Sequence, residues 1–124
     1  MKRIYEEFGK KERFIHSETL GKGHLKYLSR LGITNYDAWP YHNLTVKDVK
    51  EELPNTFFTW NFTTRELYSF TPEQIKEKFR KAVTDGAPGM NLDLCARKIP
   101  KENIRAFIEI SKEIENLNRE VKNG

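Results

Sequence analysis

The stretch Phe70-Thr71-Pro72-Glu73-Gln74-Ile75 marks the start of a helix more clearly than any other part of the sequence. Thr71 can cap the helix, Pro72 has its backbone angle preset for the first turn, and Gln74 can close a capping box. The flanking phenylalanine and isoleucine occupy the two positions of a hydrophobic staple. Apolar residues then recur on one helical face up to an Asp-Gly pair, so the sequence predicts a helix over residues 71–85.

A second helix start of the same kind lies upstream, at Leu44-Thr45-Val46-Lys47-Asp48-Val49. Thr45 can act as the cap, and Asp48 is an acidic residue at the position that closes a capping box. The residue before a proline is disfavoured in a helix, so this helix should run over 46–53 and stop at Pro54.

The chain ends in a third predicted helix, over residues 100–122. Its apolar residues are spaced alternately three and four apart, at Phe107, Ile110, Ile114, Leu117 and Val121. This narrow seam covers two heptads, which is too short for an independent coiled coil. The helix therefore either docks on its own domain or forms a seam between two copies of the chain.

An aromatic segment between the first two helices has the alternation of a strand. Phe58, Trp60 and Phe62 lie at every second position, and another short apolar run ends at Phe70. This pattern predicts a β-hairpin over residues 56–70, although an extended loop over the core would look the same. Residues 91–99 fit a short helix or a strand.

These elements together predict a mainly helical (α+β) fold: a small helical domain with a short β-hairpin and a long C-terminal helix. The length of 124 residues fits a single domain over 1–124, and eight Phe, five Tyr and two Trp argue against disorder. No apolar run approaches the roughly 20 residues needed to span a bilayer, and Glu6 and Glu7 stand where a signal peptide would have its apolar stretch, so we expect a cytoplasmic protein.

The positive charge is concentrated near the N-terminus. Residues 1–30 hold eight Lys and Arg against four acidic residues, which equals the whole net charge of +4. A cationic segment on a neutral body suits a polyanion-binding surface, but a solvated basic face fits equally well.

A glycine-rich turn lies inside this basic region, at Gly21-Lys22-Gly23. Spaced leucines follow it up to Gly32, which is a natural helix terminator. Glycines at a helix start let the backbone approach a ligand closely, and the free amides of the first turn point towards an anion. The candidate phosphate-binding residues are Gly21, Lys22, Gly23, His24, Lys26 and Arg30. The alternative is a helix entry in which the glycines have structural roles alone.

Residues 17–50 resemble the helix-hairpin-helix family of DNA-binding modules. Leu20-Gly21-Lys22-Gly23, the spaced leucines and Leu31-Gly32-Ile33-Thr34 follow that order, and the helix at 46–53 matches the second helix of the motif. The resemblance implies that backbone amides grip DNA phosphate without reading base sequence. Two departures are the long aromatic link over 35–43 and Lys22, which stands where the family usually has a hydrophobic residue.

The aromatic side chains offer a second kind of surface. Tyr36, Trp39, Tyr41 and Trp60 could stack on bases or form a patch that binds a protein partner, and core packing is the alternative. The rival function is thus a small inhibitor or adaptor, for example from a phage or mobile element, that acts by binding another protein.

No catalytic or metal-binding motif is evident. Cys95 is the single cysteine, and the three histidines lack ligand spacing, so the sequence predicts no metal and no cofactor. Walker loops, nucleophile elbows and recognisable carboxylate pairs are absent. We therefore expect a non-enzymatic nucleic-acid-binding protein, with DNA favoured over RNA, or a protein-binding one, and a possible homodimer through the C-terminal helix.

Overall fold

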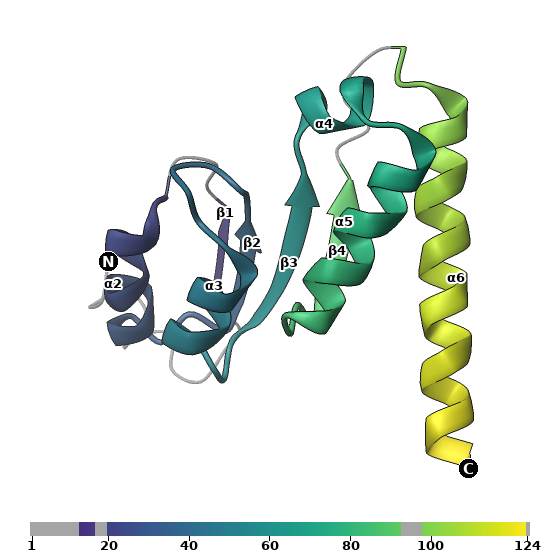
Figure 1. The fold of residues 1–124 in the computed structure, drawn as a ribbon. Coiled ribbons are helices and arrows are strands. Elements are labelled where there is room, and N and C mark those ends of the chain that lie inside the picture. The colour runs from purple at the N-terminus through teal and green to yellow at the C-terminus, as the bar shows by residue number, and fades with distance from the viewer. Residues whose placement is uncertain (1–12, 17–19, 93–97, 124) are drawn as a thin grey trace.

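The structure is a computed structural model that describes residues 13–16, 20–92 and 98–123. Strands and helices alternate along the chain (Figure 1). The strands are β1 (Phe14–His16), β2 (Asn35–Ala38), β3 (Phe57–Phe62) and β4 (Gly89–Leu92). The helical elements are η1 (Lys22–His24), α2 (Leu25–Arg30), α3 (Val46–Glu52), α4 (Thr64–Ser69), α5 (Pro72–Thr84) and α6 (Lys101–Asn123).

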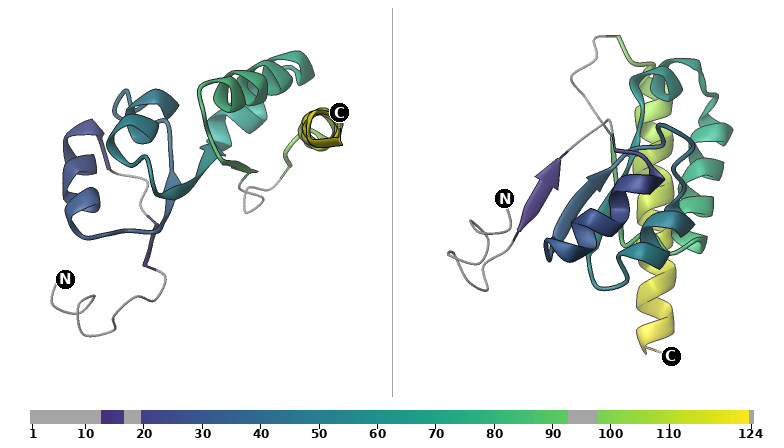
Figure 2. Two further views of the ribbon diagram at one scale, coloured as in Figure 1. Left: turned by 90° about the horizontal axis from the view of Figure 1, so that it is seen from below. Right: turned by 90° about the vertical axis from the view of Figure 1, so that its left-hand side faces the viewer.

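The four strands form one parallel sheet in the order β1-β2-β3-β4. Each strand therefore pairs with the next strand along the chain, after a helical crossover that returns to the same end of the sheet. Crossovers of this kind are nearly always right-handed. Because the chain always moves in the same direction across the sheet, from β1 to β4, all crossover helices lie on one face. Figure 2 shows this one-sided arrangement, in which the helices lie together on one side of the strands.

Three helices begin with the same device, a reciprocal capping box. Thr45, Thr63 and Thr71 each accept a hydrogen bond from the backbone amide three residues later, at 3.1–3.2 Å. The side chains of Asp48, Glu66 and Gln74 accept in return from the backbone amides of those threonines. The boxes at Thr45 and Thr71 confirm the predicted starts of α3 and α5.

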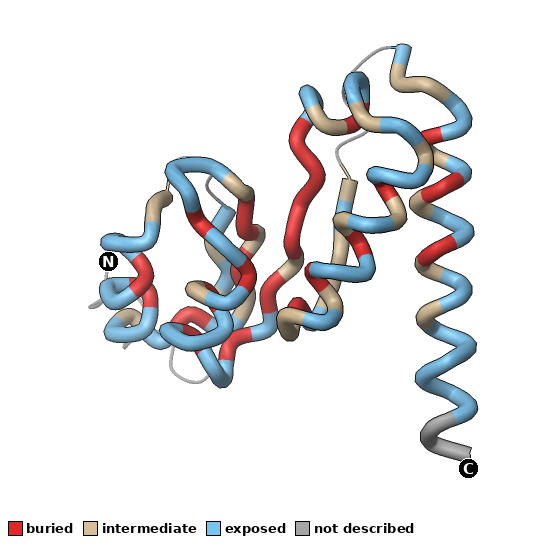
Figure 3. The backbone as a smooth tube through the Cα atoms, viewed as in Figure 1, coloured by how far each residue is buried: buried red, intermediate tan, exposed pale blue. Residues whose placement is uncertain are grey.

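The core lies between the sheet and its helices, in two clusters (Figure 3). The first cluster joins Tyr36, Phe58 and Trp60 of the sheet to apolar residues of α2 and α3. The second joins Phe62 to α4, α5 and α6. Phe58, Trp60 and Phe62 alternate along β3, so one face of a single strand contributes to both clusters.

The predicted mainly helical fold class is wrong, because the protein is an α/β protein built on a parallel sheet. The predicted hairpin over 56–70 is not formed. Its first arm is β3, which pairs with β2 and β4 rather than with the residues predicted as the second arm. Its second arm is helical, since Thr63 caps α4 directly after the strand. Residues 89–92, partly within the ambiguous segment, form β4, and residues 93–97 lie outside the described part.

The predicted C-terminal helix is present as α6 and packs on α5. Ile110 is fully buried, and the ring of Phe107 meets the rings of Phe62 and Phe79 edge-on, at centroid distances of 5.6 and 5.2 Å. Leu117 is 53% exposed, so the internal contact ends within the second half of the seam. No helix in the described residues is long and apolar enough to cross a membrane.

Candidate functional site

A row of polar side chains crosses the face of the sheet opposite the helices. The strand register places His16 of β1 beside Asp37 of β2, and Asp37 beside Thr59 of β3. Side chains two residues apart on a strand share a face, and the helix-facing residues are the intervening Tyr36, Phe58 and Trp60. We refer to His16, Asp37 and Thr59 as the polar row.

Asp37 is the centre of the polar row. Its Oδ2 lies 2.9 Å from Nδ1 of His16, and its Oδ1 accepts a hydrogen bond of 2.5 Å from the hydroxyl of Thr59. An ionised carboxylate can only accept hydrogen bonds, so Nδ1 of His16 carries a proton. In the neutral imidazole this leaves the lone pair on Nε2. The His16 side chain is 53% exposed, so this nitrogen belongs to an accessible ring.

Aromatic and amide side chains border the row at the carboxyl ends of the strands. The ring of Trp39 meets the His16 ring edge-on, with centroids 6.1 Å apart, and Tyr41 stacks on Trp39 at 6.4 Å. Asn61 is buried and donates from Nδ2 to the carbonyl of Ala38, at 2.9 Å. The strand order therefore brings side chains of three chain segments together beside the row.

The other end of this face is apolar. Phe14 and Phe57 are 57% and 50% exposed and flank Asn35 in the next row of the register. Gly89 allows Phe57 to lie across β4, because a Cβ at position 89 would come within 3.1 Å of the Phe57 ring and 3.2 Å of the Thr59 methyl. The face thus offers an apolar area beside a hydrogen-bonding row.

The predicted phosphate-binding turn is already engaged with its own chain. The amide of Gly21 donates to Nδ1 of His24 at 3.1 Å, and Nζ of Lys22 lies 3.1 Å from the carboxylate of Asp48. The hydrogen bond to Asp48 raises the pKa of Lys22. Gly23 is exposed, with open space where a Cβ would lie.

Two of the predicted nucleic-acid contacts lie together on the exposed side of α2. Nζ of Lys26 and Cζ of Arg30 lie 5.3 and 5.8 Å from the ring centroid of Tyr27, which is 51% exposed. In the segment that resembles the helix-hairpin-helix family, β2 lies between α2 and α3 and pairs with β1 and β3. The helix-hairpin-helix resemblance stays a prediction.

The four aromatic residues predicted to bind a partner divide unequally. Tyr36, Trp39 and Trp60 are buried, at 1%, 6% and 5% exposure, whereas Tyr41 is 39% exposed. Of these four residues, Tyr41 is therefore the one that is accessible to a protein partner. Within the described residues no group of three His, Cys, Asp or Glu side chains could hold a metal ion. Cys95 lies outside these residues.

The polar row was missed in the sequence, although two of its three strands leave a signal. Asn35-Tyr36-Asp37-Ala38 alternates polar and apolar residues between two predicted helices, which is typical of a strand with one buried face. Thr59 alternates with aromatic residues in the same way. His16 comes from a strand of three residues, which is too short to stand out.

The fold and this site define a parallel α/β protein with a polar row across the face of its sheet opposite the helices. No family model and no curated protein matches the chain. Among solved structures it is similar to a methyltransferase from Methanosarcina mazei, with a TM-score of 0.73 and 14% identity over 92% of this chain. The chain spans 34% of the length of that methyltransferase. At this identity the likeness shows the shared fold.

Proposed function

We propose that the polar row binds a small polar ligand and exchanges a proton with it through Nε2 of His16. The observation that supports this function is the double hydrogen bond to Asp37, from His16 on one side and Thr59 on the other. His16 is the last residue of β1 and Asp37 is the last but one of β2, so these two side chains lie near the carboxyl ends of their strands, where parallel α/β sheets usually bind ligands.

The hydrogen bonds fix the imidazole for this role. A carboxylate on Nδ1 selects the tautomer in which Nε2 can accept a proton, and it stabilises the imidazolium that forms. Thr59 occupies the second carboxylate oxygen, so Asp37 cannot easily turn away from His16. Histidine is also the side chain that most readily changes charge near neutral pH.

Methyl-group transfer is the first reaction class to test, because the similar solved structure is a methyltransferase. In such a transfer the nucleophile of the acceptor bonds to the methyl group, the bond to the donor's leaving group breaks, and a protonated nucleophile must lose its proton. Nε2 of His16 could accept that proton. This proposal replaces the expectation of a non-enzymatic protein.

The experiment follows the imidazole nitrogens by NMR while thiols, carboxylic acids, amines and phosphate monoesters are added separately. We expect at least one class to shift Nε2 of His16, and to lose this effect in Asp37→Asn. His42→Asn is the matched control, because His42 is exposed at a left-handed turn position that asparagine tolerates. If every class shifts His16 no more than His42, the polar row is not a ligand site.

A second candidate function is nucleic-acid binding through α2, favoured by the exposed Tyr27 with Lys26 and Arg30 beside its ring. Cations can contact phosphate while the ring stacks on a base. The double variant Lys26→Gln, Arg30→Gln should lower the slope of log affinity against log salt by about two. Lys101→Gln, Lys112→Gln on α6 is the matched control. Equal slopes in both double variants would exclude α2 as the contact.

A further inference from the structure

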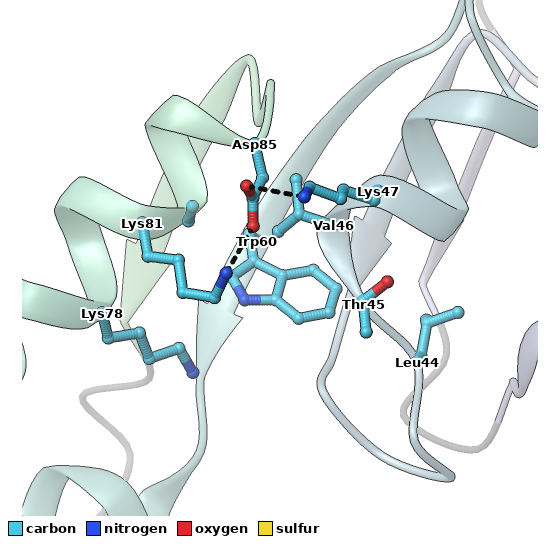
Figure 4. Close-up of a pocket in the computed structure, with 9 residues that line it drawn as sticks. Leu44, Thr45, Val46, Lys47, Trp60, Lys78, Lys81 and Asp85 are labelled. Carbon is cyan, nitrogen blue, oxygen red and sulfur yellow. Dashed lines mark hydrogen bonds and ion pairs between the residues drawn. The ribbon is translucent and has the colours of Figure 1, made fainter.

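A cavity of about 250 Å³ lies between α3 and α5, on the helix side of the sheet (Figure 4). The indole of Trp60 lies against it, and Leu44, Val46 and Ala82 line its apolar part. Trp60 and Asn61 are consecutive on β3 and therefore point to opposite faces. The cavity is thus separated by the sheet from the polar row.

Lysines of both α3 and α5 border the cavity. Figure 4 shows Lys47, Lys78 and Lys81 around the indole, with Asp85 between two of them. The carboxylate of Asp85 lies 3.0 Å from Nζ of Lys81 and 3.8 Å from Nζ of Lys47. Both lysines are more than 70% exposed, so their ammonium groups can turn towards a ligand.

Lys78 is the inner cation of this group, with a side chain that is 14% exposed. Its Nζ donates to Glu66 and, at 3.1 Å, to the carbonyl of Asn61, and it lies 4.5 Å from the ring centroid of Phe62. An ammonium group has three donors, so one remains beyond these two hydrogen bonds. Three ammonium groups therefore face two carboxylates around the cavity, Asp85 and Glu66, which leaves an excess of positive charge.

We propose that this cavity binds a small aromatic carboxylate, with its ring against Trp60 and its carboxylate between Lys78 and Lys81. An apolar pocket with a few polar groups at one end is the usual form of a small-molecule site. A bare phosphate would leave the apolar wall uncovered, and a neutral ring would leave the cations unused. Burial lowers the pKa of Lys78, and a bound anion would favour its charged form.

The probe is 3-phenylpropanoate, and 3-phenylpropanol is its uncharged counterpart. Trp39→Phe leaves Trp60 as the single tryptophan, because the chain has two. In this variant we expect saturable quenching of Trp60 fluorescence by the acid, with at least about tenfold weaker binding of the alcohol. Equal binding of the acid and the alcohol would overturn the proposal, as would an absence of saturation at millimolar concentration.

The carboxylate position is tested with Lys81→Gln, which removes an exposed charge and leaves the apolar lining intact. We expect about tenfold weaker binding of 3-phenylpropanoate, whereas Lys76→Gln on α5, whose lysine pairs with Glu109 instead, should bind like the parent. Contacts between the probe ring and the Ala82 methyl, measured by NMR in the unmodified protein, do not depend on any variant. Binding without these contacts, or equal affinity in the two lysine variants, would contradict the proposed site.

Discussion

Asp37 Oδ2 lies 2.9 Å from His16 Nδ1, although 21 residues separate the two positions in the chain. The parallel register of β1 and β2 brings them together, since His16 and Asp37 are direct partners across the strands. The contact therefore depends on correct strand pairing and not on a local loop. Changes at Asp37 should alter the chemistry of His16 while leaving the backbone in place.

Asp37→Asn should change the tautomer of His16. A neutral amide accepts the Nδ1 proton less strongly than a carboxylate does, so a larger share of the rings should carry the proton on Nε2. The measurement is the pair of imidazole ¹⁵N shifts of the neutral ring. Asp85→Asn, which changes a carboxylate paired with lysines, is the control. Unchanged shifts in Asp37→Asn would mean that the hydrogen bond does not select the tautomer.

Tyr36→Phe should stabilise the protein modestly at neutral pH. The Tyr36 hydroxyl is buried and has no hydrogen-bond partner among the residues that the structure describes. Leaving a buried polar group unpaired is unfavourable, so its removal should raise the free energy of unfolding by about 1 kcal/mol. Thermal and urea denaturation measure this, with the exposed Tyr41→Phe as control. A loss of more than about 1 kcal/mol would reveal a partner for the hydroxyl.

The same variant should change the response to alkaline pH. Burial raises the pKa of Tyr36 to about 12, above its ordinary value of 10.0. Between these values the unfolded chain has lost the proton while the folded protein keeps it, so stability falls as pH rises. When the pH equals the raised pKa, titration of Tyr36 should have lowered the free energy of unfolding by about 2 to 3 kcal/mol. Denaturation of both proteins at a series of pH values between these two pKa values should show this loss in the parent and not in Tyr36→Phe. If the free energy of unfolding falls equally with pH in both proteins, the prediction is wrong.

Asn103→Ala should be among the more damaging single changes on α6. Asn103 is buried, and its Nδ2 donates to the carbonyls of Leu67 and Phe70 at 2.9 and 2.8 Å, which satisfies the end of α4. Removal of the amide leaves two acceptors unpaired and should lower the free energy of unfolding by about 2 to 4 kcal/mol. Asn118→Ala, at an exposed position of the same helix, should change it by less than about 0.5 kcal/mol. If both variants lower the free energy of unfolding by similar amounts, these hydrogen bonds do not stabilise the fold.

Aspartate substitutions along α6 should separate its internal contact from any contact between copies. Ile114 is half-buried against the second core cluster, so Ile114→Asp should lower the melting temperature. Leu117→Asp should leave it unchanged, because that side chain is 53% exposed. If light scattering finds a dimer in the parent and a folded monomer in Leu117→Asp, the exposed end of α6 forms the contact. An unfolded Leu117→Asp would place this residue in the core instead.

The helices could be predicted because their signals are local. A threonine cap, a staple and a terminating glycine all act within one or two turns, and α3 and α5 begin as Thr45 and Thr71 indicate. The same rule would have found α4, since Thr63 and Glu66 form an equal capping box. The predicted hairpin instead assigns Leu67 and Phe70 to its second arm, which leaves no place for this helix.

The sheet could not be predicted in the same way, because its partners are distant. The aromatic alternation correctly indicated a strand at Phe58, Trp60 and Phe62, but alternation does not name the neighbour of a strand. His16 pairs with Asp37 and Asp37 with Thr59, each across a helical crossover. The polar row exists through those pairings alone, so it was missed together with the fold. The repeated order of strand and helix was the remaining clue to a parallel sheet.

The presence of β3 in both core clusters has a consequence for how the protein opens. Phe58 and Trp60 belong to one cluster and Phe62 to the other, and α5 joins the two in the same way through Ala82 and Phe79. Neither cluster can separate from the sheet without disturbing a strand that the other requires. Backbone amides of β3 should therefore exchange with solvent deuterium through global unfolding, while the solvent-exposed end of α6 frays independently.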